Sequence, residues 1–496
     1  MTAPAFPPFD FGRYVWRASP DDASHWKREA GGGEYIDDVF HTKNHGEQFL
    51  FLALKATLSK PVPTTELVAR ARDAWSALRF STPTVAAHTE HDAAGTSLIT
   101  YRTAKDATEV QDWAARTVRL VEGTPDLDDL RFELGKLMIP EQNGDQTFLY
   151  IVARSDTSYD FVLRTSHVTF DGAGIKIVLT LFLTKLALYL SDPALVAKEK
   201  FEWGAEAKNL LPCISEILGP TEKREGETYT RCLGNMLGDL GGAMPRQYGF
   251  KKRNIGPGPT RRISYKFSAE ESKKLLDAVK VRGFTFNHVA HAAVTLVCAL
   301  DNPPSASTPP DATFVYYGLV DGRARLAEPY SGKLGYPGYA LGMTAIQVPV
   351  SAAIPAAGEG ERDVLLRLSG IVKDEYAKQR AYESLMAIVC QEVDIMLGGM
   401  KAGGPPPPPW MGPWYAGDGV GETGLQPEYG DARGANVITV DDFFVSLNKT
   451  DPGPFFRSFS WRGRITVSAD ANVSAMPQGD VEKWVEKWAE LLRLVL

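Results

Sequence analysis

One histidine and one aspartate stand four residues apart where a strand is expected to give way to a helix. His167 and Asp171 are followed by Gly172 and then by the apolar run 175–190. The residues before them, Phe161–Leu163, are aromatic or aliphatic and are typical of the end of a buried strand. An imidazole near its ordinary pKa can accept a proton at neutral pH. This setting therefore predicts a general base at His167.

A histidine with an aspartate four residues later can also be a structural residue beside a helix-capping carboxylate. Gly172 and the strand-then-helix setting favour the functional interpretation. The pattern His-x-x-x-Asp-Gly resembles the signature of the chloramphenicol-acetyltransferase-like superfamily, which includes plant BAHD acyltransferases, fungal trichothecene acetyltransferases and condensation domains of nonribosomal peptide synthetases. The resemblance implies that His167 deprotonates an acceptor hydroxyl or amine, which then attacks an acyl thioester. It also implies that Asp171 points away from substrate and holds its loop through an arginine salt bridge.

A second stretch, far along the chain, resembles the same superfamily. Asp321-Gly-Arg323-Ala-Arg325 precedes the Gly-rich segment 335–340, as an Asn/Asp-x-Arg-x-Arg strand does in BAHD-type enzymes. Alternation along a strand would put the three charged residues on one face. The resemblance implies that Arg323 pairs with Asp171, with Arg325 as its substitute. The alternative is a surface strand with two solvated arginines.

The predicted strand 436–445 offers candidates for stabilising charge in the reaction. It falls where BAHD enzymes carry Asp-Phe-Gly-Trp-Gly, of which little remains here. Polar residues at this place in condensation-like relatives imply that Thr439 or Asn436 presents a donor to the developing oxyanion. Donors held in advance in this way are commonly a large catalytic contribution.

A basic cluster with Lys252, Arg253 and Arg261 brackets a Gly-Pro-Gly-Pro run. Such cations bind phosphate well, which predicts a contact with the phosphates of CoA. A solvated linker is the alternative interpretation.

The surrounding elements predict an α/β (α+β) protein in which two chloramphenicol-acetyltransferase-like domains enclose a central solvent tunnel, with His167 at its middle. At 496 residues the chain exceeds what one core usually supports. We expect an N-terminal domain over residues 1–212, a crossover loop over 213–262 and a C-terminal domain over 263–496. Predicted strands include 49–54, 147–152, 158–165 and 263–267, and predicted helices include 64–78, 106–121, 268–281, 362–397 and 480–494.

The composition is that of an ordinary soluble protein and excludes several functions. A net charge of −7 argues against nucleic acid as the main partner. Four scattered cysteines without close spacing predict neither a zinc site nor a disulfide framework. No signal peptide is evident, and the apolar run 175–190 is interrupted by two lysines and is short for a membrane span. We expect a cytoplasmic monomer that spans no membrane and binds neither a metal nor a permanent cofactor.

The resemblance implies an acyltransferase that moves an acyl group, acetyl in the first place, from acyl-CoA to a small apolar secondary metabolite. Ser166 stands where many condensation domains have a first histidine, and no carrier or adenylation region is evident, which favours a free-standing enzyme with acyl-CoA as co-substrate. The pattern is most similar to fungal acetyltransferases of secondary metabolism, with O-acylation expected over N-acylation. A carrier-protein-dependent enzyme, a cyclase that reuses His167 without an acyl donor, and a non-catalytic binding module with an interacting proline run remain alternatives.

Overall fold

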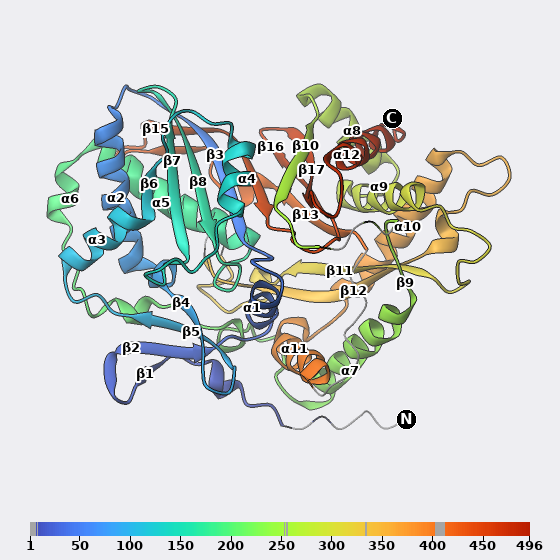
Figure 1. Cartoon of the computed structure of the whole chain (residues 1–496), viewed down its shortest axis with the longest axis horizontal. Coiled ribbons are helices and arrows are strands. Elements are labelled where there is room, and N and C mark those ends of the chain that lie inside the picture. The colour runs from blue at the N-terminus through green and yellow to red at the C-terminus, as the bar shows by residue number, and fades with distance from the viewer. Residues whose placement is uncertain (1–5, 7, 252, 254–255, 333–334, 402–411) are drawn as a thin grey trace.

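The computed structural model describes residues 6, 8–251, 253, 256–332, 335–401 and 412–496. Two sheet-containing halves lie side by side, the first around a six-stranded sheet and the second around a four-stranded sheet (Figure 1). The proline run considered in the sequence lies outside the described residues. This architecture agrees with the predicted fold class.

The sheet of the first half carries the strand that leads to His167. Its order is β14-β15-β3-β8-β7-β6, where β14 is Glu428–Gly430, β15 is Asn436–Leu447, β3 is Leu50–Leu58, β8 is Ser158–Thr165, β7 is Thr147–Ala153 and β6 is Val118–Leu120. The central strands β3, β7 and β8 are largely buried, and β3 and β7 are mostly apolar. The helices α2 (Thr64–Ser81), α3 (Ala107–Thr117) and α5 (Gly172–Ser191) pack on this sheet.

Helix α5 is the core helix of the first half. Among the described residues it alone is, as a single helix, long and apolar enough to cross a membrane, so the expectation of a run too short for a span is corrected. Two thirds of its apolar window is nevertheless buried within the protein. Core helices of this kind have the same composition as membrane spans, so the composition by itself does not argue for a membrane.

A smaller sheet and three further helices complete the first half. The sheet has the order β1-β2-β5-β4, with β1 at Arg17–Ser19, β2 at Asp22–Glu29, β5 at Ser97–Arg102 and β4 at His88–His91. The helices are α1 (Gly33–Lys43), α4 (Leu127–Gly135) and α6 (Ala194–Lys198). Helix α1 lies near the middle of the view and packs against helix α11 of the second half (Figure 1).

The second half contains two sheets. One has the order β10-β17-β16-β13 (Thr260–Lys266, Arg464–Asn472, Phe455–Trp461 and Trp414–Val420), and the other has the order β12-β11-β9 (Leu341–Pro349, Thr313–Asp321 and Gln247–Tyr248). Its helices are α7 (Gly226–Ala243), α8 (Ala269–Val281), α9 (Phe286–Asp301), α10 (Glu361–Arg380), α11 (Leu385–Lys401) and α12 (Gln478–Arg493). The predicted capping box at the start of α8 is confirmed, because Ser268 and Glu271 exchange side-chain and backbone hydrogen bonds.

Three expectations from the sequence differ from the structure. The predicted crossover loop contains the helix α7, whose apolar side packs on α11 and β12. The predicted helix over residues 362–397 is two helices, α10 and α11. Strands β14 and β15 belong to the first-half sheet although they come late in the chain, so no boundary drawn by residue number separates the two sheets.

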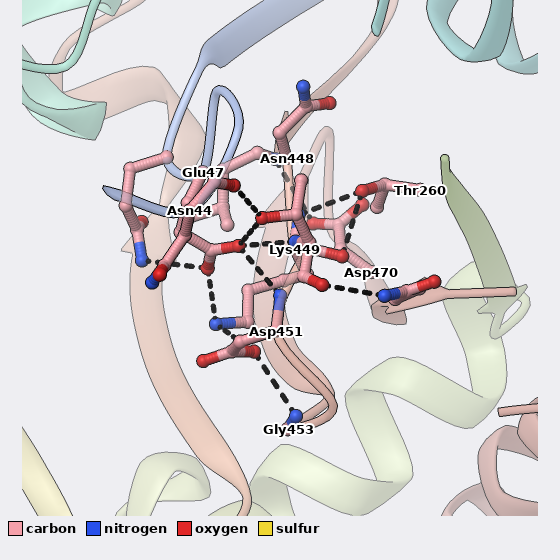
Figure 2. A network of polar contacts seen from close by, with 12 residues as sticks. Asn44, Glu47, Thr260, Asn448, Lys449, Asp451, Gly453 and Asp470 are labelled. Atoms are coloured by element: carbon pink, nitrogen blue, oxygen red, sulfur yellow. Dashed lines mark hydrogen bonds and ion pairs between the residues drawn. The ribbon is translucent and has the colours of Figure 1, made fainter. Parts of the chain in front are cut away.

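A buried polar network ties the late segment of the chain to the first half (Figure 2). Lys449 Nζ lies 2.6 Å from Glu47 Oε1 and 2.7 Å from Asp451 Oδ1. The amide of Lys449 donates to Thr260 Oγ1 of β10 at 2.8 Å. The network therefore joins the start of β3, the end of β15 and the start of β10 at one buried point.

Candidate active site

A cavity of about 190 Å³ lies between the two halves and has His167 in its wall. Its lining comes from α1, β3 and α5 of the first half and from β11, β12, β13, β16 and the helices α9 and α10 of the second. One part of the lining is apolar and aromatic, with Ile36, Phe40, Leu319, Leu341, Met343, Trp414 and Phe455. The imidazole therefore faces a cavity and is not enclosed on all sides by packed side chains.

His167 is placed by β8, which ends at Thr165, and by the turn that leads into α5. Its Nδ1 lies 3.0 Å from Oδ2 of Asp37, a buried carboxylate on α1. A carboxylate at Nδ1 favours the tautomer that carries its proton there, and this leaves Nε2 as the proton acceptor. His167 Nδ1 and Asp37 Oδ2 are in ion-pair contact without hydrogen-bond geometry, so the carboxylate acts on the imidazole through its charge.

The Asp37 carboxylate also sets the charge of the imidazole. Burial opposes the protonated form, but the negative charge of Asp37 outweighs it, with a smaller contribution from Asp171, and the pKa of His167 lies above its ordinary value. A base with a raised pKa is a stronger proton acceptor, provided that the pH is high enough for it to be neutral.

Tyr339 completes the surroundings of the imidazole. Its ring centroid lies 5.4 Å from that of His167, and burial, with Asp37 nearby, holds the pKa of its hydroxyl well above the ordinary range. The ring fits only because residue 33 is glycine, since a Cβ there would lie 2.1 Å from Tyr339 Cε1. Gly33 is the first residue of α1, so the lack of a side chain there lets Tyr339 pack against the start of this helix, beside His167.

The predicted pairing of Asp171 with Arg323 is confirmed. Asp171 is fully buried, caps α5 by accepting from the Gly174 amide at 2.7 Å, and accepts from Arg323 at 2.8 and 3.1 Å and from the Ala340 amide at 2.8 Å. Burial opposes ionisation of this carboxyl, but the Arg323 charge and these hydrogen bonds outweigh it and lower its pKa. Asp171 therefore points into protein and not into the cavity.

Arg323 connects the motif loop to the Gly-rich segment 335–340. It donates to the carbonyl oxygens of Tyr336 and Gly338 at 2.8 and 2.7 Å and to Asp321 at 2.9 Å, in addition to Asp171. It lies in a short 3-10 turn after β11 and not on the predicted strand, because β11 ends at Asp321. From this turn, the Arg323 guanidinium contacts both the motif loop at Asp171 and the Gly-rich segment 335–340.

Arg325 does not take the substitute role, because it pairs instead with Glu222 at 2.9 Å. Gly172 begins α5 and lines the cavity.

The predicted oxyanion donors lie at the wrong end of their strand. In the first-half sheet Thr439 is aligned with Thr57, which is aligned with Ser158, whereas Leu447 is aligned through Leu50 with Thr165, next to His167. Eight residues of strand separate Thr439 from Leu447, which is roughly 26 Å. Asn436 lies further away and its amide donates to Thr439 at 2.8 Å. The expectation of an oxyanion role for Thr439 or Asn436 is therefore corrected.

The residues predicted to contact CoA are engaged elsewhere or fall outside the described residues. Arg253 pairs with Asp301 at 2.7 Å and with Asp480 at 3.2 Å, and Arg261 pairs with Asp129 at 2.6 Å. Neither lines the cavity. Lys252 lies outside the described residues. A contact of these residues with CoA phosphates stays a prediction. It would require Arg253 and Arg261 to bind phosphate in addition to the carboxylates with which they already pair.

Sequence reasoning did not find Asp37, Lys176 or Arg457, all of which line the cavity. Lys176 carried a signal, because a lysine inside an apolar helix needs a polar neighbour or a cavity. Asp37 carried no such signal, since it lies far before His167 in the sequence and forms no short motif with it. Within the described part of the chain no group of His, Cys, Asp and Glu side chains could hold a metal ion.

Comparison with known proteins assigns the chain to a family. A family model described as "15-O-acetyltransferase Tri3" matches residues 6–351. The chain is 22% identical to trichothecene 15-O-acetyltransferase TRI3 of Fusarium sporotrichioides, with 98% of each chain covered. It is 30% identical to the acyl-CoA-dependent acyltransferase MAC1 of Pseudozyma antarctica, over 33% of each chain.

Solved structures agree on the fold. The structure of TRI3 from Fusarium sporotrichioides superposes with a TM-score of 0.87 at 20% identity and covers 99% of this chain and 100% of that one. The first condensation domain of the calcium-dependent antibiotic synthetase superposes with a TM-score of 0.63 at 14% identity, covering 94% and 96%. The two-halved architecture is thus one that acetyltransferases and condensation domains share.

Proposed function

Because the chain belongs to the Tri3 family of O-acetyltransferases, we propose that it transfers an acetyl group from acetyl-CoA to a hydroxyl group of a small secondary metabolite. His167 is the general base of this reaction. The observation that carries the proposal is the Asp37–His167 pair at 3.0 Å in the wall of a cavity between the halves.

The reaction follows from this geometry in two proton transfers. Nε2 of His167 takes the proton of the acceptor hydroxyl while that oxygen attacks the thioester carbonyl. Asp37 stabilises the imidazolium that forms, as a carboxylate at Nδ1 does in serine hydrolases. The tetrahedral intermediate then expels the CoA thiolate, which receives the proton back from His167. Holding both substrates at one imidazole also supplies proximity.

The acceptor is a largely apolar molecule such as a terpenoid alcohol. Aromatic and aliphatic side chains such as Phe40, Met343 and Trp414 supply an apolar surface in the cavity, which suits a hydrocarbon skeleton with one reactive hydroxyl. The names of the TRI3 relatives, which describe trichothecene acetyltransferases, point the same way.

The test is an assay with purified protein, acetyl-CoA and a panel of terpenoid alcohols, in which mass spectrometry detects the acetylated product. His167→Ala should abolish product formation while leaving the thermal unfolding curve in place. His25→Ala, which changes a half-buried histidine on β2 outside this cavity, should retain activity. Turnover by the His167→Ala variant would overturn the proposed role of His167.

The same assay separates the alternatives. Turnover with free acetyl-CoA excludes a requirement for a carrier protein. A product of unchanged mass that depends on His167 would indicate a cyclase. A protein that binds the alcohols without converting them would be a binding module, and either of these two results would overturn the proposal.

A further inference from the structure

A buried lysine lines the same cavity. Lys176 is on α5, 6% exposed, and shares the helix face of Gly172 and Ala173, which also line the cavity. Within the described parts of the chain its ammonium makes neither an ion pair nor a hydrogen bond; the ring of Phe443 lies 5.9 Å away. A buried charge without a partner is costly, so such a lysine calls for a physical reason.

A buried arginine lies at the same part of the cavity. Arg457 on β16 is 4% exposed and uses only Nη1 in its ion pair, which joins both oxygens of Asp418 at 2.7 and 2.8 Å. Its buried Nε has no hydrogen-bond partner among the residues that the structure describes. The guanidinium also approaches the motif loop, since a Cβ built on Gly172 would lie 3.8 Å from Nη1.

The charges at this part of the cavity do not balance. Lys176 and Arg457 line it together with Asp418, the carboxylate that acts most strongly on Lys176. Asp321 also lines the cavity, but it is half-exposed and pairs with Arg323. Asp418 pairs with Arg457 and not with Lys176, and both cations keep donors that have no partner among the described residues. This is the arrangement of a site for a negatively charged group.

We infer that Lys176 and Arg457 form a subsite that binds an anionic oxygen group, carboxylate or phosphate, of one of the two substrates. The inference rests on the proposed function and deepens it. Because Lys176 lies one helical turn beyond Gly172, a substrate anchored there can extend along α5 toward His167. The group can come from the phosphates of CoA or from a carboxylate on the acceptor.

The protonation of Lys176 is consistent with this role. Burial lowers its pKa below the ordinary value, and the Asp418 charge offsets only part of the effect. An anion bound beside the ammonium would replace the solvation that burial removes and would favour the charged form.

Titration calorimetry with two matched pairs of probes tests the inference. CoA is compared with pantetheine, which lacks its phosphates, and benzoate, which suits an aromatic cavity, with uncharged methyl benzoate. The variant is Lys176→Met, which keeps the stem that packs on Gly424. The control is Lys185→Met on the same helix, because Lys185 pairs with Glu199 outside the cavity.

The wild-type protein should bind at least one charged probe more tightly than its uncharged counterpart. Lys176→Met should weaken binding of that probe by about tenfold to a hundredfold, the range of a lost charge-assisted hydrogen bond, and leave the uncharged probe unchanged. An effect on CoA assigns the subsite to the donor, and an effect on benzoate assigns it to an acceptor carboxylate. Lys185→Met should bind all four probes as the wild type does.

Unchanged binding of both CoA and benzoate by Lys176→Met would overturn the inference. A variant that binds the probes normally but has a lower kcat in the acetylation assay would also overturn it, because Lys176 would then act only on the transition state. The titrations are repeated in the His167→Ala background. Because binding needs no turnover, failure of the subsite would appear in the calorimetry, whereas failure of the general-base role would appear only in the acetylation assay. Thermal unfolding of Lys176→Met should be unchanged or shifted upward, since an unpaired buried charge is removed.

Discussion

In the proposed reaction, the basicity of His167 depends on a carboxylate from a different element, and this makes the proton state of the site testable. Asp37 raises the pKa of His167, so the imidazole is neutral, and able to accept a proton, only above that raised pKa. We predict that kcat/KM of the wild type rises with pH along a limb whose midpoint lies above the ordinary histidine value of about 6.5.

Replacing Asp37 with Asn should move that midpoint toward lower pH, because the negative charge that favours the imidazolium is gone. It should also lower the plateau rate, by roughly a hundredfold or more, since the imidazolium formed in the reaction loses its partner. Asp38→Asn is the matched control, because Asp38 is the next residue on α1 and pairs with His91 at 2.7 Å instead. Equal pH profiles for the two variants would contradict the role of Asp37.

The sequence predicts the residues of the motif but not their partners from distant segments. His167, Asp171 and Arg323 are found because each belongs to a short pattern with a recognisable spacing. Asp37 forms no such pattern with His167, and only the packing of α1 against the motif loop brings them together. Thr439 was misplaced for the opposite reason, since its strand was predicted correctly but the register that moves it away from His167 is set by pairing with β3.

At the scale of elements, the N-terminus of α5 is held against the segment 335–340 by a close backbone approach. A Cβ on Gly174 would lie 2.0 Å from the carbonyl oxygen of Pro337, so only glycine fits there. We predict that Gly174→Ala lowers the free energy of unfolding by about 1–3 kcal/mol and reduces activity, because the motif loop must shift.

Chemical denaturation of the variant measures the effect on stability, and Gly238→Ala provides the control. Gly238 is exposed on α7 with open space where its Cβ would stand, so alanine there should stabilise the helix by about 0.5–1 kcal/mol. Equal effects of the two substitutions would show that the approach to Pro337 is not tight.

The Asp171–Arg323 pair fixes the same junction through charge. Removing Arg323 leaves Asp171 buried without a cation, and removing the Asp171 charge leaves Arg323 with only the half-exposed Asp321 as counter-charge. We therefore predict that Asp171→Asn and Arg323→Ala each cost about 3–5 kcal/mol of stability. The double variant should cost far less than the sum of the two, because each single change already breaks the pair. Unfolding free energies measured over the full cycle check this, and strict additivity would refute the coupling.

Element prediction from sequence succeeded where the local signal is strong. The apolar run of α5 and the capping box of α8 identify those helices without tertiary information. Helix α7 is hard to predict because its 18 residues include five glycines, and its apolar side gains stability by packing on α11 and β12. The break between α10 and α11 was missed because both helices are apolar on their buried sides.

At the scale of the whole molecule, the cavity exists only while the two halves keep their relative position. The return of β15 into the first-half sheet and the buried network at Lys449 both cross between the halves. Lys449 Nζ also lies 4.9 Å from the ring centroid of Trp414, which lines the cavity. The network that holds the halves together therefore also positions part of the cavity wall.

We predict that Lys449→Met destabilises the protein by about 3–5 kcal/mol at neutral pH, because Glu47 and Asp451 lose their shared cation. Lys273→Met, which breaks an exposed pair with Asp277, should cost less than about 1 kcal/mol and serves as the control. Urea denaturation measures both variants.

The pH dependence of the Lys449→Met defect distinguishes lost charge pairing from lost packing. Burial already raises the pKa of Asp451 to about 7, with Lys449 opposing the rise, and removing Lys449 should raise it further. A carboxyl with a raised folded-state pKa binds its proton more tightly in the folded protein, so it costs stability as the pH rises above the unfolded value of about 4. The defect of the variant should therefore be small near pH 5 and grow toward pH 8. A defect that is constant across this range would mean that Lys449 contributes its aliphatic stem and not its charge.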